Sequence, residues 1–410
     1  MHNTYQIFDY KKLSAILPAL WIALVVAACS GGGDGNGGGS TGSAASSTAS
    51  GSTTSGSTTS AAPAAAGTAS GTTLSVTTLG DQSTYRFISQ GGFLVSEETT
   101  FSMPADVVSF VIHLTGTDVG SRLTFNSMTN PQGTPVDVTL SGCPPGETYC
   151  NVMLPYKPQL AATSGTWRYR LQSRSSNLTS FTVKSSVRSG TPPAATKWTV
   201  QPYMTGTQYN PTVVEAAMSR FVTVAAKNSI NVSVNSVARI SGSQYATVSA
   251  DFTNSTTKAM VSNGASNVVN LFFVEDLRGT GGSTLGMAAG IPGSLGIAGS
   301  HNGVLINISA HEIGGQVNTS IMGDTAIHEA GHFLGLYHTT ESDGLTHDPL
   351  ADTPECTVTQ DTNNDGSLTP NECRNFDGAN LMFWLASTTI DQTVLTADQK
   401  AILRATPLAQ

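Results

Sequence analysis

The chain has 410 residues, of which 39% are hydrophobic and 11% charged, and its formal net charge is −8. This length permits two or three domains, each with its own core. The few charges and their acidic balance exclude the clustered basic face that nucleic-acid binding requires.

The first 28 residues are typical of a secretory signal. Lys11 and Lys12 precede an apolar run from Leu13 to Ala28, and small residues lead up to Cys29. A positive start, a short apolar run and a small-residue cleavage site describe such a signal, and the run is short for a membrane span. The sequence Val-Ala-Ala-Cys resembles the lipobox of bacterial lipoproteins. We therefore predict lipidation at Cys29 in preference to an ordinary cleaved signal.

Residues 29–72 are predicted to be a disordered tether. From Ser30 onward they are almost entirely Gly, Ser, Thr and Ala, a composition that cannot bury enough apolar area to offset chain entropy. As a flexible coil the segment spans about 35 Å root-mean-square. Ser30 directly after the Cys resembles lipoproteins sorted to the bacterial outer membrane. We expect that location, with either the periplasm or the cell exterior as the side faced.

Residues 73–190 are predicted to form a β-sandwich. Segments 107–116, 133–142 and 165–173 alternate in the manner of strands and are separated by Gly, Pro and Asn. The last segment loosely resembles the closing strands of pre-peptidase domains found beside secreted bacterial proteases. No catalytic constellation occurs in this region, and His113 is interpreted as a packing or surface residue inside a strand.

Four cysteines remain if Cys29 carries lipid, and an even number in an exported chain favours disulfides. They are Cys143, Cys150, Cys356 and Cys373. Three pairings are possible. We favour the pairing of neighbours, because it closes one loop inside each predicted domain.

Residues 197–410 are predicted to be an α/β (α+β) domain. Strand patterns occur at 198–204, 268–276 and 303–309, and residues 211–228 have helical apolar spacing with Pro in the first turn. Strands mixed with helices indicate an α/β layer. The whole chain is thus expected to be multidomain, with an all-β sandwich followed by an α/β unit.

A metal-binding pattern lies within this second domain. His328 and His332 are four residues apart, which places both imidazoles on one side of a helix with Glu329 between them. A catalytic zinc site needs three protein ligands and one open position. Gly335 can adopt positive φ and end the helix, so that the chain turns and brings His338 to the metal.

A second His-Glu pair begins at His311, but it does not continue as a metal motif. Gly315 occupies the place that a second His would need, and two adjacent glycines disfavour a helix. We interpret His311 as a loop residue at the end of a strand.

The motif HEAGHFLGLYH resembles the zinc signature of the metzincin metalloproteases. In that clan a Met-containing turn underlies the metal, and Met382 in NLMFW matches it. Among metzincins the pappalysin-like group is most similar, through this motif, residues 348–354, paired cysteines and LTADQ at 395–399. The resemblance covers about 197–410. Family members often have Tyr two residues after the turn Met, where this chain has Trp384.

The resemblance implies hydrolysis of protein or peptide substrates. Zinc lowers the pKa of its bound water and polarises the scissile carbonyl. Glu329 would take the proton of that water and deliver it to the leaving amine.

A calcium loop is predicted between the last two cysteines. The segment DTNNDGSLTPNE matches the pattern D-x-[DN]-x-[DN]-G-x₅-E, although Pro370 makes a full EF-hand implausible. The pappalysin resemblance also implies calcium in this region, and Asp348 and Asp352 are candidates for a further site. The predicted loop ligands are Asp361, Asn363, Asp365, Ser367 and Glu372.

The leading hypothesis is therefore a zinc endopeptidase, expected to be monomeric, tethered to the outer membrane by a lipid anchor. One alternative is a surface binding protein or adhesin with a non-catalytic zinc domain. Glu329 argues against it, because a structural zinc site has no use for a general base. A second alternative is a zinc amidase acting on the cell wall.

Overall fold

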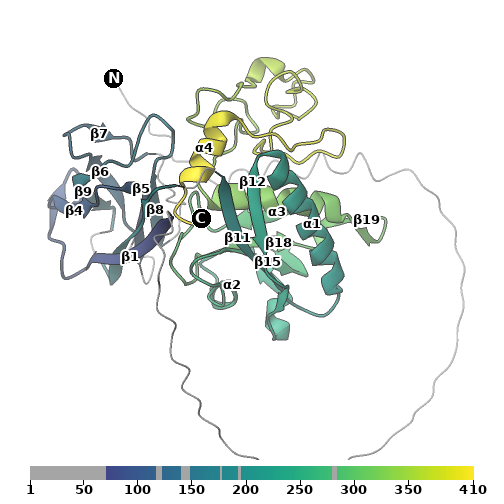
Figure 1. Cartoon of the computed structure of the whole chain (residues 1–410), viewed down its shortest axis with the longest axis horizontal. Helices are drawn as coiled ribbons and strands as arrows, with labels where there is room; N and C mark the ends of the chain where they lie inside the picture. Colours follow the sequence, from purple (N-terminus) through teal and green to yellow (C-terminus); the bar gives the residue numbers. More distant parts are fainter. Residues whose placement is uncertain (1–70, 117–121, 140–147, 176–177, 193–194, 279–283) are drawn as a thin grey trace, which may run out of the picture. The chain divides into compact units, whose positions relative to one another are not determined.

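The computed structural model describes residues 71–116, 122–139, 148–175, 178–192, 195–278 and 284–410 (Figure 1). The predicted signal, Cys29, the tether up to residue 70 and Cys143 lie outside these ranges, and Thr72, the predicted end of the tether, is the first residue of a strand. Within the ranges, no helix combines the length and the apolar character that crossing a membrane demands.

The described residues up to Gly190 form two antiparallel sheets. One sheet has the strand order β1-β10-β5-β8, and the other has the order β2-β3-β9-β6-β7 with β4 also paired to β9. The strands are β1 (Thr72–Asp81), β2 (Phe87–Gln90), β3 (Phe93–Ser96), β4 (Thr99–Met103), β5 (Val107–Gly116), β6 (Thr124–Thr129), β7 (Pro135–Val136), β8 (Tyr149–Leu154), β9 (Gly165–Ser173) and β10 (Phe181–Gly190).

The two sheets share one aromatic-rich core. In β9 the alternating residues Trp167, Tyr169 and Leu171 are buried, as period-2 patterning requires. They join Phe101 of β4 and Phe110 of β5 in a single cluster, and the Phe110 ring meets Trp167 edge-on at 5.0 Å. This arrangement is a sandwich. The strands expected at 107–116 and 165–173 are present, whereas segment 133–142 forms only the two-residue β7 in its described part.

Strand β5 is buried on both faces. Phe110 and Ile112 belong to the sandwich core, while Val111, which points to the opposite face, belongs to the core of the C-terminal half together with Met153 of β8. An apolar run without clean alternation is what a strand covered on both sides requires. The sandwich core and the C-terminal core are therefore separated by a single sheet.

Polar contacts also join the two halves. Arg188 of β10, which is 1% exposed, donates to the backbone carbonyls of Arg404 and Thr406. A cation is favourable at these carbonyls because they lie at the C-terminal end of a helix. Asn151 of β8 donates to the carbonyl of Pro292.

The C-terminal half is built around one mixed sheet with further short elements. Its strands are β11 (Thr196–Met204), β12 (Ile230–Val234), β13 (Ala238–Arg239), β14 (Thr247–Ser249), β15 (Val269–Val274), β16 (Asp276–Arg278), β17 (Gly286–Ala288), β18 (Val304–Asn307), β19 (Glu312–Ile313) and β20 (Gln316–Val317). Its helices are α1 (Pro211–Lys227), α2 (Ser255–Val261), α3 (Thr319–Phe333) and α4 (Ala397–Ala405), with 3₁₀ turns η4 (Ser243–Tyr245), η5 (Ser309–His311) and η6 (Val358–Gln360).

The main sheet has the order β12-β11-β15-β18-β17, in which only β17 runs antiparallel to its neighbour. Helices α1 and α3 contact each other and cover one face (Figure 1). Residues Leu271 and Phe273 of β15 face them, whereas Phe272 and Val274 belong to a separate cluster that includes Met260 of α2. Burial of both faces explains the unbroken apolar sequence of β15.

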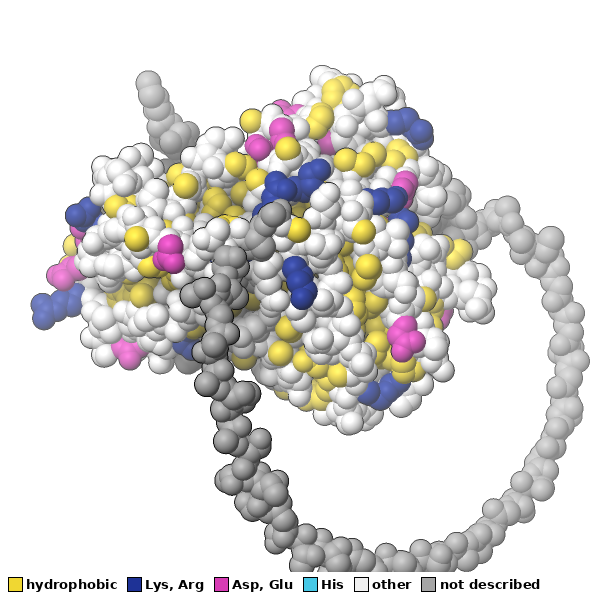
Figure 2. All heavy atoms as spheres, viewed as in Figure 1, with side chains coloured by type: hydrophobic (Ala, Val, Ile, Leu, Met, Phe, Trp, Pro, Cys, Tyr) yellow, Lys and Arg dark blue, Asp and Glu magenta, His cyan; other side chains and the backbone are white. Residues whose placement is uncertain are grey.

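After helix α3 the chain runs mainly through turns to α4. A disulfide joins Cys356 and Cys373, with Cα atoms 5.6 Å apart, which confirms the predicted pairing of these two residues. Cys150 is also disulfide-bonded, and Cys143, its predicted partner, lies outside the described residues. On the face shown in Figure 2, charged side chains are scattered among uncharged ones, as the low charged content leads one to expect.

The interpretation of His113 as a packing residue leads to a testable stability effect. Its ring lies 2.9 Å from Asn151 Oδ1 and 3.0 Å from Ser186 Oγ, and burial lowers the pKa of His113 to about 4 despite the hydrogen bond with Asn151. Between pH 6.5 and 4 the unfolded chain binds a proton that the folded chain does not, so stability is lost as the pH falls through this window.

We expect His113→Gln to remove this part of the pH dependence, which amounts to about 3 kcal/mol across the window. Urea unfolding of parent and variant at pH 7.5, 5.5 and 4 measures it. Equal slopes of unfolding free energy against pH in the two proteins would contradict the assignment.

Candidate metal centre

Helix α3 positions two of the three predicted zinc ligands. It begins after Asn318, whose side-chain oxygen accepts from the Ile321 amide at 3.1 Å and so caps the first turn. Its apolar residues pack into the C-terminal core. His328 and His332 lie one turn apart near its end, with ring centroids separated by 4.7 Å.

The helix ends where the motif places its glycine. Gly335 has φ +109°, its amide donates to the His332 carbonyl, and the Leu336 amide donates to the Gly331 carbonyl, both at 2.9 Å. These two bonds form a Schellman motif, in which positive φ reverses the chain. The reversal carries His338 back over the helix.

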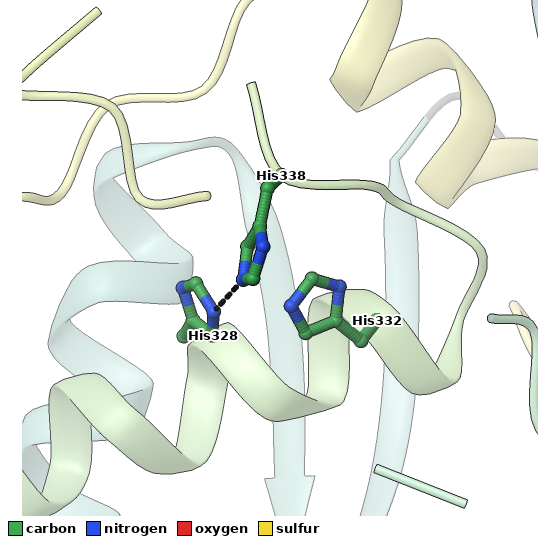
Figure 3. Close-up of side chains that lie close together, drawn as sticks. All are labelled: His328, His332 and His338. Carbon is green, nitrogen blue, oxygen red and sulfur yellow. Dashed lines mark hydrogen bonds between the residues drawn. The ribbon is translucent and has the colours of Figure 1, made fainter. Parts of the chain in front are cut away.

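The three imidazoles converge on one point (Figure 3). Ring centroids of His332 and His338 lie 4.5 Å apart, and those of His328 and His338 lie 5.3 Å apart. One nitrogen from each ring lies within 4.8 Å of the other two. This grouping is suited to a single small cation.

Each ring is held by an oxygen acceptor at its Nδ1 atom. His328 Nδ1 lies 2.7 Å from the Leu381 carbonyl, and His332 Nδ1 lies 2.8 Å from the Leu336 carbonyl. His338 Nδ1 lies 3.0 Å from Glu341 Oε1. Because Nδ1 must donate to these oxygens, the lone pair of each neutral ring is on Nε2, which is the tautomer that binds a metal.

The electrostatics of the cluster also fit a cation. Burial lowers the pKa of His328 to about 3 and that of His332 well below its usual range, so both rings are neutral. For His338 burial acts in the same direction, but the Glu341 carboxylate outweighs it and raises the pKa. The Nε2 atoms of His328 and His338 are 3.3 Å apart. Two lone pairs this close repel unless a proton or a metal ion lies between them, and three imidazole nitrogens are a donor set that zinc prefers.

Glu329 lies beside the cluster and is partly buried. Burial raises the pKa of its carboxyl to about 7, although a hydrogen bond from the Ala288 backbone opposes this. Strand β17 comes close to the same side chain, because a Cβ placed on Gly286 would be 2.7 Å from Glu329 Cγ. A carboxyl group thus lies beside β17 and interacts electrostatically with His338.

Met382 lies directly beneath the helix. It is fully buried, and a Cβ placed on Gly331 would be 2.6 Å from its sulfur. The Met382 amide donates to Asn380 Oδ1 at 2.8 Å, which forms a tight turn. The preceding carbonyl, that of Leu381, is the acceptor for His328. The turn therefore packs against the helix and also orients a ligand.

Two further residues from the sequence lie away from the cluster. His311 lies in η5 and is not part of the histidine group; it is 2% exposed, and its Nε2 lies 3.0 Å from Thr325 Oγ1 of α3. Trp384 packs with the Cys356–Cys373 disulfide and donates from its indole to the Leu368 carbonyl at 2.8 Å. The contacts of the Trp384 side chain are therefore with the disulfide loop.

The predicted calcium ligands bond mainly within their own loop. The two oxygens of Glu372 accept from the backbone and side chains of Thr362 and Thr369. Asp361 accepts from the Gly366 amide at 2.9 Å, Asn363 Nδ2 donates to Asp365 Oδ2 at 3.0 Å, and the Ser367 amide donates to Asp365 Oδ1. In the described part of the chain, these carboxylates are not among the groups whose oxygens converge within 4.8 Å.

Asp348 and Asp352 have separate structural roles. Asp348 accepts from the Leu350 amide and the Thr353 hydroxyl, and burial raises the pKa of Asp348 to about 7. Asp352 accepts from the Asp398 amide in the first turn of α4, where a negative charge is favourable.

Sequence reasoning missed the groups that orient the ligands. Glu341, 3 residues beyond the last histidine, is the one with a readable signal, since an acidic residue near a ligand histidine is a common partner for its second nitrogen. The carbonyls of Leu336 and Leu381 have no side-chain signature. Gly286 allows β17 to approach Glu329. It belongs to no sequence motif that would have marked it as part of the site.

Comparisons with known proteins show slight likenesses. No family model and no curated protein matches the chain. Archaemetzincin from Methanopyrus kandleri is 15% identical over 36% of this chain and 78% of its own, with a TM-score of 0.24. A family two carbohydrate esterase from Cellvibrio japonicus is 12% identical over 41% of this chain and 53% of its own, with a TM-score of 0.17.

A GH87 α-1,3-glucanase from Streptomyces thermodiastaticus is 14% identical over 50% of this chain and 40% of its own, with a TM-score of 0.18. TM-scores this low do not establish a shared fold. Any functional assignment therefore depends on the geometry of the site.

The contact between His338 and Glu341 predicts an effect on metal affinity. Glu341→Gln removes the charge that holds His338 Nδ1, and loss of such a partner typically weakens zinc binding 10- to 100-fold. Competition with a chromophoric chelator measures the dissociation constant. Glu355→Gln, at an exposed glutamate in the same part of the chain, is the matched control, and equal affinities in the two variants would contradict the role of Glu341.

Proposed function

We propose that the protein is a zinc-dependent endopeptidase of the metzincin clan, most similar to its pappalysin-like group. The observation that carries the proposal is the cluster of His328, His332 and His338, in which each Nδ1 is held by an oxygen and the Nε2 atoms converge. Glu329 lies partly buried beside them.

The donor set favours a catalytic site over a structural one. In the described part of the chain the cluster contains three histidines and no fourth Cys, His, Asp or Glu ligand. Structural zinc sites use four protein ligands, whereas catalytic sites keep one position for water or substrate. The alternative of a binding protein with an inert zinc domain leaves both the open position and Glu329 without a purpose.

Bound zinc would supply a water of lowered pKa and polarise the scissile carbonyl. The protein's own contribution is Glu329. Its carboxylate would take the proton from the attacking water and deliver it to the leaving amine. The three Nδ1 acceptors keep the rings from turning during this cycle.

Strand β17 supports a peptide substrate. In the described residues it is the last strand of its sheet and pairs only with β18, so its other edge has no strand partner there. An extended peptide can pair with such an edge, and Gly286 lies directly against Glu329. A substrate bound in this way has its backbone next to the general base, which favours a peptidase over a cell-wall amidase.

The location of the enzyme remains a prediction from the sequence. Lipidation of Cys29 and a flexible tether up to residue 72 would anchor the peptidase at the bacterial outer membrane. The sandwich and the zinc domain would act as one monomeric unit on protein or peptide substrates.

Loss of Glu329 tests the function. We expect Glu329→Gln to lower kcat/KM on a quenched casein substrate by at least about 100-fold while one zinc per chain remains bound. Chelation should abolish cleavage by the parent, and added zinc should restore it.

Three results would distinguish the alternatives. Equal cleavage by parent and Glu329→Gln would contradict the proposed mechanism. A parent that binds one zinc and releases amines from peptidoglycan, but cuts no protein, would identify the amidase. A zinc-loaded parent that is inert toward both substrates would favour the binding protein.

We also propose calcium binding by the loop between Cys356 and Cys373, supported by its sequence pattern. Calcium would have to displace the Thr362 and Thr369 donors from Glu372. If it binds the folded state alone, calcium at 100 times its dissociation constant stabilises the protein by about 2.7 kcal/mol. Thermal unfolding at saturating zinc, with and without calcium, measures this; Glu372→Gln should abolish the shift, and an unchanged Tm in the parent would contradict the site.

A further inference from the structure

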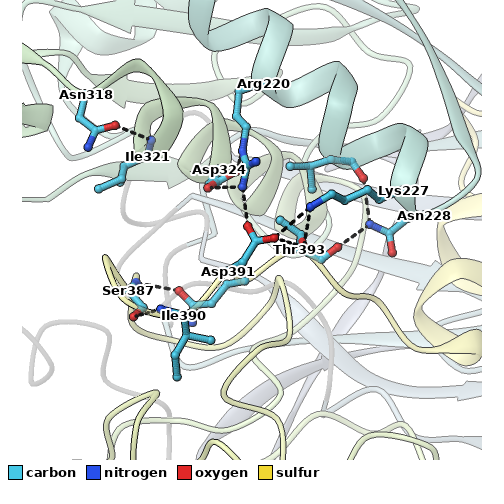
Figure 4. Close-up of polar contacts among 12 residues, drawn as sticks. Arg220, Lys227, Asn228, Asn318, Ile321, Asp324, Ser387, Ile390, Asp391 and Thr393 are labelled. Atoms are coloured by element: carbon cyan, nitrogen blue, oxygen red, sulfur yellow. Dashed lines mark hydrogen bonds and ion pairs between the residues drawn. The ribbon is translucent and has the colours of Figure 1, made fainter.

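The guanidinium group of Arg220 contacts carboxylates from two separate segments of the chain (Figure 4). Arg220 extends from α1 to Asp324 of α3, with Nε 2.7 Å from Oδ1 and Nη2 3.0 Å from Oδ2. The same Nη2 lies 2.7 Å from Asp391 Oδ1, in the segment that follows the Met382 turn. A two-pronged contact of this kind fixes direction as well as distance.

The helices meet closely at this point. A Cβ placed on Gly323 would be 2.5 Å from the Ala217 carbonyl and 2.7 Å from Arg220 Cβ. No side chain therefore separates α1 from α3 next to the ion pair. Asp324 lies one turn before His328 on the same helix, so the position of Arg220 is transmitted to the first ligand through rigid backbone.

The contact between Arg220 and Asp391 leads to the metal centre by a second path, which runs through residues 391–395. Residues 393 and 395 are also held by α1. Asn228, at the end of α1, donates to the Thr393 carbonyl at 2.8 Å and accepts from the Leu395 amide at 3.0 Å. Between these two residues, the Val394 carbonyl accepts from the Leu381 amide at 2.8 Å. The Leu381 carbonyl in turn accepts from His328 Nδ1. We call residues 391–395 the strap.

Lys227 makes a contact that serves as an internal comparison. Its Nζ lies 2.9 Å from Asp391 Oδ2, so it neutralises the same carboxylate as Arg220. In the described structure its hydrogen bonds and its ion pair go to Asp391 and Thr393 and none goes to α3, although its charge acts on Asp324 at longer range. Lys227 therefore bonds to the strap alone, whereas Arg220 bonds to both the strap and α3.

We propose that Arg220 is a positioning residue. It fixes α3 and the Met382 turn relative to each other, and so sets the orientation of His328. The inference rests on the proposed zinc function. Partly exposed ion pairs contribute little to stability, with a median of about 0 to 1 kcal/mol. The importance of this one lies in geometry, because both paths from Arg220 end at the same metal ligand.

The test compares Arg220→Met with Lys227→Met, which removes the same charge from Asp391. Arg220→Met should raise the zinc dissociation constant about 10-fold, the lower end of the loss seen when a direct partner of a metal ligand is removed, because Arg220 acts on His328 only through α3 and the strap. It should also shift the visible absorption bands of the cobalt-substituted protein. It should also lower kcat more than it raises KM. Lys227→Met should stay within about twofold of the parent in all three.

Two conservative variants complete the design. Arg220→Lys keeps the charge but cannot make the paired guanidinium contacts with Asp324. Its zinc affinity should therefore lie between those of the parent and Arg220→Met. Asp391→Asn cuts one arm at a residue whose side chain is 57% exposed, and should give a smaller loss in the same direction. If Arg220→Met does not fold, the zinc affinity of Asp391→Asn tests the proposal in its place.

If Arg220→Met lowers Tm but keeps the parent's zinc affinity and cobalt spectrum well below that Tm, Arg220 is only a structural brace and the inference is wrong. Equal effects of Arg220→Met and Lys227→Met would also overturn it, since charge alone would then be responsible. A parent that binds no zinc overturns the proposed function as well, and this separates the two failures.

Discussion

The geometry of the candidate metal centre depends on one constraint: to hold a metal ion, the three imidazoles must be neutral and present their Nε2 lone pairs to the same point. Such an arrangement is repulsive without a cation, so the rest of the fold has to impose it. It does so by giving every Nδ1 an oxygen acceptor, and these come from Leu336, Leu381 and Glu341. The metal site is consequently only as rigid as the three separate segments that supply these oxygens.

This requirement explains why a long irregular region can follow α3. Two of the acceptors, Glu341 and the Leu381 carbonyl, come from this region, which the Cys356–Cys373 disulfide crosslinks. Helix α4 contributes Gln399, which pairs through its side-chain amide with Asn380 at the start of the Met382 turn. The sandwich supports α4 in turn, because Arg188 binds its terminal carbonyls.

Long elements with one strong period were predictable, and short or tertiary ones were not. The α1 pattern, with its N-terminal Pro211, and the apolar strands β15 and β18 appear as expected. Helix α2 and strand β17 are too short to show a period, and β17 is defined by its pairing with β18. The spacing in HEAGHFLGLYH could predict that three histidines meet, because helix geometry and Gly335 determine that. It could not reveal which oxygens hold them, since those are brought in by packing.

The central claim is that one zinc ion binds the three histidines and keeps a non-protein ligand. X-ray absorption at the zinc edge of the purified protein tests it most directly. The account predicts one zinc per chain, coordinated by three imidazole nitrogens and one oxygen from water, with no sulfur. Sulfur ligation, two imidazoles only, or the absence of stoichiometric zinc binding would contradict it.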